Sequence, residues 1–138
     1  QVLLHRSAVL PLDHEPHAGM LRLHRALLAL RHGHDALQGA DQGPVAAEAI
    51  DDDTLALVRG SATMTMAVVV RLRGAGTCEL SVIDHRRTAG AWRVLLTSES
   101  PDFTVDPAPP EVDLSGSSPV LRFGRPSAVV LARALTPE

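Results

Sequence analysis

Histidines lying close to carboxylates are the first candidates for chemistry. His14 and His17 are three residues apart, and His32 and His34 are two apart. The neighbouring carboxylates are Asp13, Glu15 and Asp35. Two His and one carboxylate can hold zinc. However, the first pair lies in a loop bounded by prolines, and the second brackets the expected end of a helix, where the dipole favours His without any metal. We therefore expect no metal and no cofactor.

The run Asp51-Asp52-Asp53 is a candidate for calcium, which prefers carboxylate oxygens. A calcium loop of the EF-hand type needs ligands at alternate positions and a distal Glu. This run instead separates two short apolar segments, as the turn of a hairpin does. We expect a solvated turn.

A nucleophilic triad can be drawn from Ser98, His85 and Asp84. The chain has no G-x-S-x-G elbow, because Ser61 and Ser115 both lack the flanking glycines. Glycoside hydrolysis needs two carboxylates held rigidly in a cleft, and the carboxylates here fall mostly in turns. We find no catalytic constellation.

Composition narrows the classes of partner. The 138 residues carry 21% charged side chains and a net charge of −3, and all thirteen basic residues are Arg, without a cluster. Only one Trp and two Phe are present, so stacking on nucleic acids or sugars is disfavoured. The single Cys78 excludes an internal disulfide and a Cys-based zinc site. We expect neither a nucleic acid nor a membrane as partner.

The sequence also leads to expectations about the cellular compartment of the protein and about whether the chain is part of a longer polypeptide. No apolar run approaches the twenty residues of a membrane span. The start has no long apolar run ending in small residues, so it does not resemble a signal peptide. We therefore expect a cytoplasmic protein. Because the chain begins without Met, we also expect it to continue a longer polypeptide.

The segment Met20–Arg31 predicts a helix over about residues 18–32. It contains no Gly, Pro or β-branched residue. Gly33 follows, at a position where helices often end in the left-handed conformation. The apolar residues form two stripes at about 100° per residue. The first is Met20, Leu23, Leu27 and Leu30, widened by Ala26, and the second is Leu21 and Leu28, with His24 and Arg31 between them.

The period changes to two after residue 45, which predicts strands. The expected strands are 45–50, 54–59, 63–72, 77–83, 92–96, 111–114, 120–123 and 128–132. Their spacing indicates a mainly β fold, an antiparallel β-sandwich of about 7–8 strands preceded by one N-terminal α-helix. The proline-rich stretch 101–110 is expected to be a surface loop. On the clearest strand we expect one set of alternating residues to face the core: Met64, Met66, Val68, Val70 and Leu72.

The order of one Leu- and Arg-rich helix followed by a sandwich resembles the C-terminal end of α-amylase superfamily enzymes. The stretch HAGMLRLHRALLALRHGHDAL is similar to the last barrel helix of that family, with His24 in place of a common aromatic residue. IDDDTLALVRG and TMAVVVRLRGAG resemble the hairpin and strand that follow, with Arg71 where the family has Asn. The loop SAVLPLDHEPHAG and the end PVLRFGRPSAVVLARA look most like malto-oligosyltrehalose trehalohydrolases.

This resemblance implies a division of the chain and a role. Residues 1–40 would be the tail of a (β/α)₈ barrel that lies upstream, and 41–138 the C-terminal sandwich domain. The family's catalytic carboxylates lie on barrel strands, so the chain itself is expected to be inactive. Its parent would hydrolyse α-glucans and release trehalose from maltooligosyl trehalose. The helix would dock on the barrel, its partner, through Met20, Leu21, Leu23, His24, Leu27, Leu28, Leu30 and Arg31.

Two alternatives belong to other classes. One is a free-standing β-sandwich that binds carbohydrate or protein, which exposed aromatic residues would favour. Trp92 is in phase with Val94 and Leu96, so we expect it in the core instead. The other is an enzyme that uses the His-rich N-terminal segment, and it ranks last.

Overall fold

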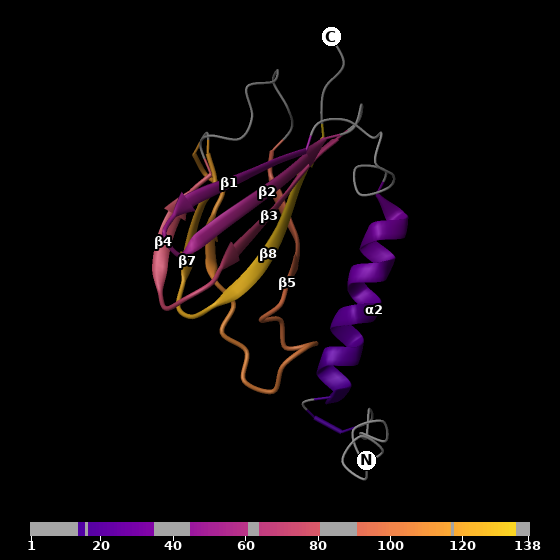
Figure 1. Ribbon diagram of the computed structural model, residues 1–138. Helices are drawn as coiled ribbons and strands as arrows, with labels where there is room; N and C mark the ends of the chain where they lie inside the picture. Colours follow the sequence, from indigo (N-terminus) through magenta and orange to yellow (C-terminus); the bar gives the residue numbers. More distant parts are fainter. Residues whose placement is uncertain are drawn as a thin grey trace, which may run out of the picture.

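The computed structural model describes residues 14, 15, 17–34, 45–60, 64–80, 91–116 and 118–134. In these residues one helix precedes eight strands (Figure 1). Their bounds are α2 His17–Gly33, β1 Val45–Asp51, β2 Thr54–Gly60, β3 Met64–Arg71, β4 Gly76–Glu79, β5 Arg93–Thr97, β6 Glu111–Asp113, β7 Val120–Phe123 and β8 Ser127–Ala134.

The strands form two antiparallel sheets. The larger sheet has the order β1-β2-β3-β8-β5, and the smaller sheet has the order β4-β7-β6. In sequence order β1, β2 and β3 are joined as neighbours, whereas β8 returns from the C-terminal end to lie between β3 and β5. The predicted mainly β fold, with one helix ahead of the strands, is confirmed.

The main core lies between the two sheets. Ala56, Ala67, Val69, Val129 and Leu131 of the larger sheet are fully buried there. The smaller sheet and the residue after β4 contribute Cys78, Leu80, Leu121 and Phe123. Burying such a set of apolar side chains is the main stabilising contribution to a domain of this size.

The predicted core-facing set on β3 is wrong about which face meets the other sheet. The residues that point between the sheets are Ala67 and Val69. Met64, Met66 and Val68 lie on the opposite, outer face, in a second cluster with Val130 and Ala132. The reason is that both faces of β3 are covered, so alternation of apolar residues on one face did not identify the sandwich interior. Leu72 lies beyond the strand and is 58% exposed.

The second cluster is what α2 covers. Leu30 of α2 packs against it, together with Leu95 and Leu96 of β5. Figure 1 shows α2 running along the outside of the larger sheet, so the molecule has three layers: helix, larger sheet and smaller sheet.

The ends of α2 agree closely with the prediction of about 18–32. The helix closes at Gly33, but Gly74, with φ of +64°, is the only glycine of the described residues in the left-handed region. The expectation of a left-handed Gly33 is therefore wrong. The described part of the chain contains no helix with the length and apolarity needed to cross a bilayer.

Candidate docking surface of the helix

The inward face of α2 is formed by residues spaced one helical turn apart. Leu23, Ala26 and Leu30 are partly buried, and Gly19 is fully buried. Leu30 reaches the cluster around Met66 on the outer face of the larger sheet. This face attaches α2 to its own sandwich.

The first turns of α2 are held by the loop after β5. A Cβ added to Gly19 would overlap the backbone carbonyl of Phe103, so only glycine allows this approach. Arg22 donates from Nε to the carbonyl oxygen of Asp102 at 2.6 Å, and it pairs with Glu15 at 2.7 Å. The stretch 101–110 is thus the second support of α2 and not only a surface loop.

Arg125 fixes that loop to the rest of the sandwich. Its Nε donates to the Glu99 carboxylate at 2.8 Å, and its Nη1 lies 3.3 Å from the Asp106 carboxylate. The hydrogen bond to Glu99 raises the pKa of Arg125 above its ordinary value. Glu99 also accepts from the backbone N–H of Ala108 at 3.2 Å. This series of contacts, which leads from Arg125 through the 99–106 loop to Gly19, sets the position of α2.

Five of the eight predicted docking residues are exposed on α2 and form its outward face: Met20, His24, Leu27, Leu28 and Arg31. Leu21 lies about 180° around the helix from Leu30 and is partly buried. Met20 is 53% exposed, Leu27 41% and Leu28 55%. Leu28 lies about 160° around the helix from Leu30, and so points away from the sandwich. His24 and Arg31 are exposed, and His24 Nδ1 lies 2.9 Å from the Met20 carbonyl oxygen.

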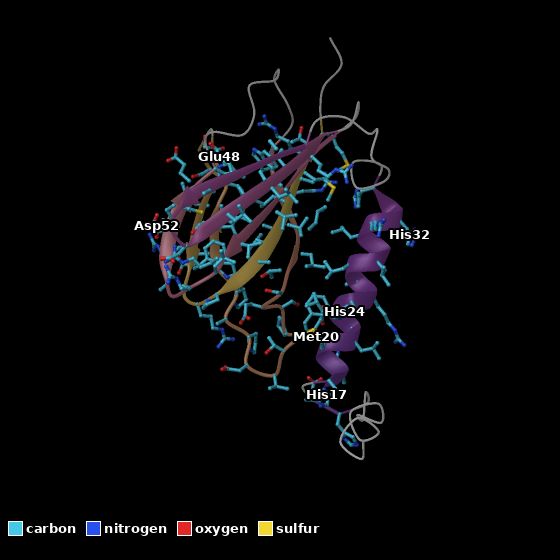
Figure 2. All side chains as sticks on the ribbon, viewed as in Figure 1. His17, Met20, His24, His32, Glu48 and Asp52 are labelled. Carbon is cyan, nitrogen blue, oxygen red and sulfur yellow. The ribbon has the colours of Figure 1, made fainter. Side chains whose placement is uncertain are left out.

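The structure therefore divides the first predicted stripe. Leu23 and Leu30 turn toward the sandwich, whereas Met20 and Leu27 stay on the flank and are largely exposed. Within the part of the chain that the structure describes, the sandwich covers two residues of this stripe and leaves the other two largely exposed. The uncovered side of α2 therefore presents three exposed apolar side chains, Met20, Leu27 and Leu28, with exposed His24 and Arg31 among them. In Figure 2, His17 and His32 mark the two ends of α2.

The acidic run after β1 forms a clamp around Arg71. Asp51 accepts from the backbone N–H of Asp53 at 2.8 Å, and this bond lowers the pKa of Asp51. Buried Arg71 donates to Thr54 Oγ1 at 2.9 Å and lies 3.6 Å from the Asp51 carboxylate. Its remaining N–H groups reach the carbonyl oxygens of Arg73, Gly74 and Ala75.

This clamp joins the turn between β1 and β2 to the turn that leads from β3 of the larger sheet to β4 of the smaller sheet. The 51–54 turn supplies the carboxylates and the hydroxyl, and the 73–75 turn supplies the carbonyls. Arg73 adds an ion pair with Asp53 at 2.7 Å. The predicted hairpin turn is confirmed, and two of its three carboxylates form ion pairs with Arg71, at 3.6 Å for Asp51 and 3.7 Å for Asp53.

The other residues singled out from sequence do not gather into a reactive site. Where the chain is described, no group of three or more His, Cys, Asp or Glu is placed to hold a metal ion. Ser98 accepts from the backbone N–H of Ala128 at 3.0 Å. Asp13, Asp35, Asp84 and His85 lie outside the described residues, as do the predicted strand ends at 63 and 81–83. Burial raises the pKa of the Cys78 thiol, which keeps it unreactive.

The three aromatic residues do not form a sugar-stacking platform. Phe123 is buried in the core, Trp92 packs against it, and Phe103 is partly buried beside α2. The guanidinium of Arg133 lies 4.9 Å from the centre of the Trp92 ring. A shallow depression on the smaller sheet has a mainly charged lining: Glu111, Val112, Asp113, Val120 and Arg122. Trp92 packs against the main core but is only partly buried, so its expected core position is met in part, and Val94, predicted in phase with it, is 41% exposed.

Comparison with known proteins gives one informative likeness. No family model matches the chain, and no curated protein matches it in sequence. A solved α-amylase from H. orenii has a similar fold, with a TM-score of 0.58 and 13% sequence identity. The similarity covers 92% of this chain and 21% of the α-amylase. The chain thus spans about a fifth of that enzyme, and at this identity the likeness shows a common fold.

Proposed function

We propose that the chain is the C-terminal sandwich region of an α-amylase-type glycoside hydrolase, in which α2 braces the catalytic barrel. The observation that carries this proposal is the outward face of α2. A helix that serves only its own sandwich needs one apolar side. Here Leu23 and Leu30 already serve the sandwich, yet Met20, Leu27 and Leu28 remain exposed on another side.

The likeness to the α-amylase supports the same role. The whole arrangement of helix and sandwich corresponds to a minor part of a much longer enzyme. The order of elements is the one that the sequence resemblance implies for the end of such enzymes. In this proposal the barrel covers the outward face of α2, and residues 1–40 belong to the barrel side of the boundary.

The chain contributes rigidity and no reacting group. Arg125 fixes the 99–106 segment, Phe103 and Asp102 fix the first turns of α2, and Leu30 fixes its second half. A barrel helix held at both ends in this way would resist separation from the barrel during thermal motion. The finer proposal is that the parent enzyme releases trehalose from maltooligosyl trehalose, a substrate class that rests on the sequence resemblance alone.

A free-standing sugar-binding module is less well supported. Such modules stack sugar rings on exposed aromatic faces. All three aromatic residues of this chain are engaged in the core or beside α2.

The test is made on the polypeptide encoded by the full reading frame. We expect a (β/α)₈ barrel directly upstream of residue 1 and hydrolysis of α-glucans by the whole product. Leu21→Glu with Leu28→Glu should shorten the half-life of that activity on heating, because charges would enter the boundary between α2 and the barrel. Ala29→Glu, on an exposed part of α2, is the control and should leave the half-life unchanged. A frame without an upstream barrel, or an unchanged half-life in the double variant, would contradict the proposal.

A further inference from the structure

Two cross-strand rows on the outer face of the larger sheet stay apolar well beyond α2, whereas the row through Met66 carries Arg59. Residues directly opposite each other on paired strands point to the same face. One cross-strand row runs Ala47, Leu57, Val68 and Val130, and the next runs Ala49, Leu55, Val70 and Ala128. Both rows cross four strands without a polar side chain.

The layer that covers this face stops partway across it. Val68 and Val130, at one end of the first row, belong to the cluster under Leu30 of α2. At the other end, Leu55 is 38% exposed and Leu57 39% exposed, and Ala47 and Ala49 are exposed as well. We call the uncovered part the β1–β2 patch: Ala47, Ala49, Leu55 and Leu57.

The widths of the elements indicate what is missing. Strands lie about 4.8 Å apart in a sheet, and a helix with its side chains is about 10 Å across, so one helix covers about two to three strands. The cluster under α2 draws its residues from β3, β8 and β5. The remaining strands of the sheet, β1 and β2, contribute no residue to that cluster, and two strands are about the width that one further helix covers.

We propose that the β1–β2 patch receives a second amphipathic α-helix that lies beside α2. The patch continues an existing helix–sheet interface without a break at Val68, and its residues are of the same kind as those under Leu30. The small Ala47 and Ala49 at the edge beside the larger Leu55 and Leu57 form a step into which the apolar ridge of a helix fits. The source of this helix, the upstream part of the same polypeptide, rests on the proposed function.

Edge-to-edge pairing is a poorer use of this region. Glu48 is paired with Ala56, so it lies on the inner face of the sheet, where it is exposed at the overhanging edge. An inward-pointing charge on an edge strand is a common device against strand addition. The open apolar surface is therefore the outer face of β1 and β2, and not their edge.

The probe is a synthetic peptide with the sequence of residues 14–34, whose Leu23 and Leu30 already fit this kind of surface. It is titrated into the isotope-labelled 138-residue chain carrying Leu21→Glu, Leu27→Glu and Leu28→Glu, which makes the outward face of α2 a poorer competing surface. Amide shifts of residues 46–58 are followed by NMR. We expect shifts in β1 and β2, and an affinity about tenfold or more lower when Leu57 is changed to Glu.

Two further variants complete the test. Ala47→Glu, at an exposed edge position, should weaken binding in the same way even if Leu57→Glu disturbs folding. Thr77→Glu, at an exposed position of the smaller sheet, is the matched control and should bind as the parent does. Absence of shifts in β1 and β2, shifts confined to β3, β8 and β5, or a peptide-free dimer broken by Ala47→Glu would overturn the proposal. The last outcome would assign the patch to a second copy of the chain. None of these outcomes bears on α2 and the barrel.

Discussion

The two faces of the larger sheet are built from the same residue types but are covered very differently. On the inner face Ala56, Val69 and Leu131 are fully buried against a second sheet. On the outer face Val68 is only partly buried under a single helix, and Leu55 and Leu57 are open. The difference is therefore made by what packs on each face, and the outer face is the one prepared for further elements.

The largest expected effect comes from comparing the same substitution at two adjacent residues of β3 that point to opposite faces of the sheet. Val69→Asp would bury an unpaired carboxylate between the sheets and cost more than about 4 kcal/mol, enough to leave the chain largely unfolded. Val68→Asp, on the outer face, should cost about 1–3 kcal/mol, because its carboxylate can reach water beside α2. Urea denaturation followed by circular dichroism measures both. Equal losses from the two variants would remove the distinction between the faces.

Loosening α2 should affect the outer face alone. Gly19→Ala places a methyl group against the carbonyl of Phe103, and we expect a loss of about 1–3 kcal/mol confined to the helix and the 99–106 loop. Amide exchange should become faster in α2 while β2, β3 and β8 keep their protection. Gly33→Ala, with open space around it, is the control and should stabilise the helix by about 0.5–1 kcal/mol. Faster exchange throughout the sandwich in Gly19→Ala would show that the layers are not independent.

Buried Arg71 lies at the end of the inner face of the larger sheet, and we expect its contacts with two turns to contribute to stability. Arg71→Met removes the donors that serve three carbonyls and Thr54, at an expected cost of about 1–3 kcal/mol. Arg73→Met removes only an exposed ion pair with Asp53 and should cost less than about 1 kcal/mol. Chemical denaturation of both proteins gives the two values. A larger loss from the Arg73 variant would contradict the clamp.

The smallest effect concerns acid stability at the same turn. The pKa of Asp51 is lowered in the folded chain below its ordinary value of 3.8, chiefly by the backbone N–H of Asp53. A lowered pKa means that the contribution to stability is present above 3.8 and is lost as the pH falls through the folded-state pKa. Asp51→Asn should therefore lower stability slightly at pH 6 and flatten its decline below about pH 4. An unchanged acid profile, measured by thermal melting from pH 2 to 6, would remove Asp51 from the clamp.

Sequence patterns predicted the elements well, because their signals are local. The strand over 120–123 and the start of the strand at Thr54 agree with the structure, and α2 differs from its prediction by one residue at each end. The orientation of β3 was missed because both of its faces are apolar. Arg71 contributed to that error, since a charged residue is usually placed outside, and its clamp across two turns involves residues up to 20 positions away.

The contacts that hold α2 against the sandwich could not be predicted from the sequence. The outward face of Met20, Leu27 and Leu28 was within the predicted docking set, because helical spacing is readable from one segment. Phe103 and Asp102 meet α2 across 80 or more residues of chain, and no local period reports such a contact. The one available signal was Gly19, a glycine just inside a segment otherwise rich in helix formers, which often marks a close approach of backbone.

We propose that the outward face of α2 is an unfilled docking surface. The most direct measurement is the fluorescence of an apolar dye, 8-anilinonaphthalene-1-sulfonate, together with light scattering, on the 138-residue chain. We predict that the chain binds the dye or self-associates, because exposed apolar patches of a few hundred Å² promote association. Leu21→Glu with Leu28→Glu should reduce both signals while the sandwich stays folded, and Ala29→Glu should leave them unchanged. A monomeric chain that ignores the dye, or a double variant that binds it as strongly as the parent, would contradict the claim.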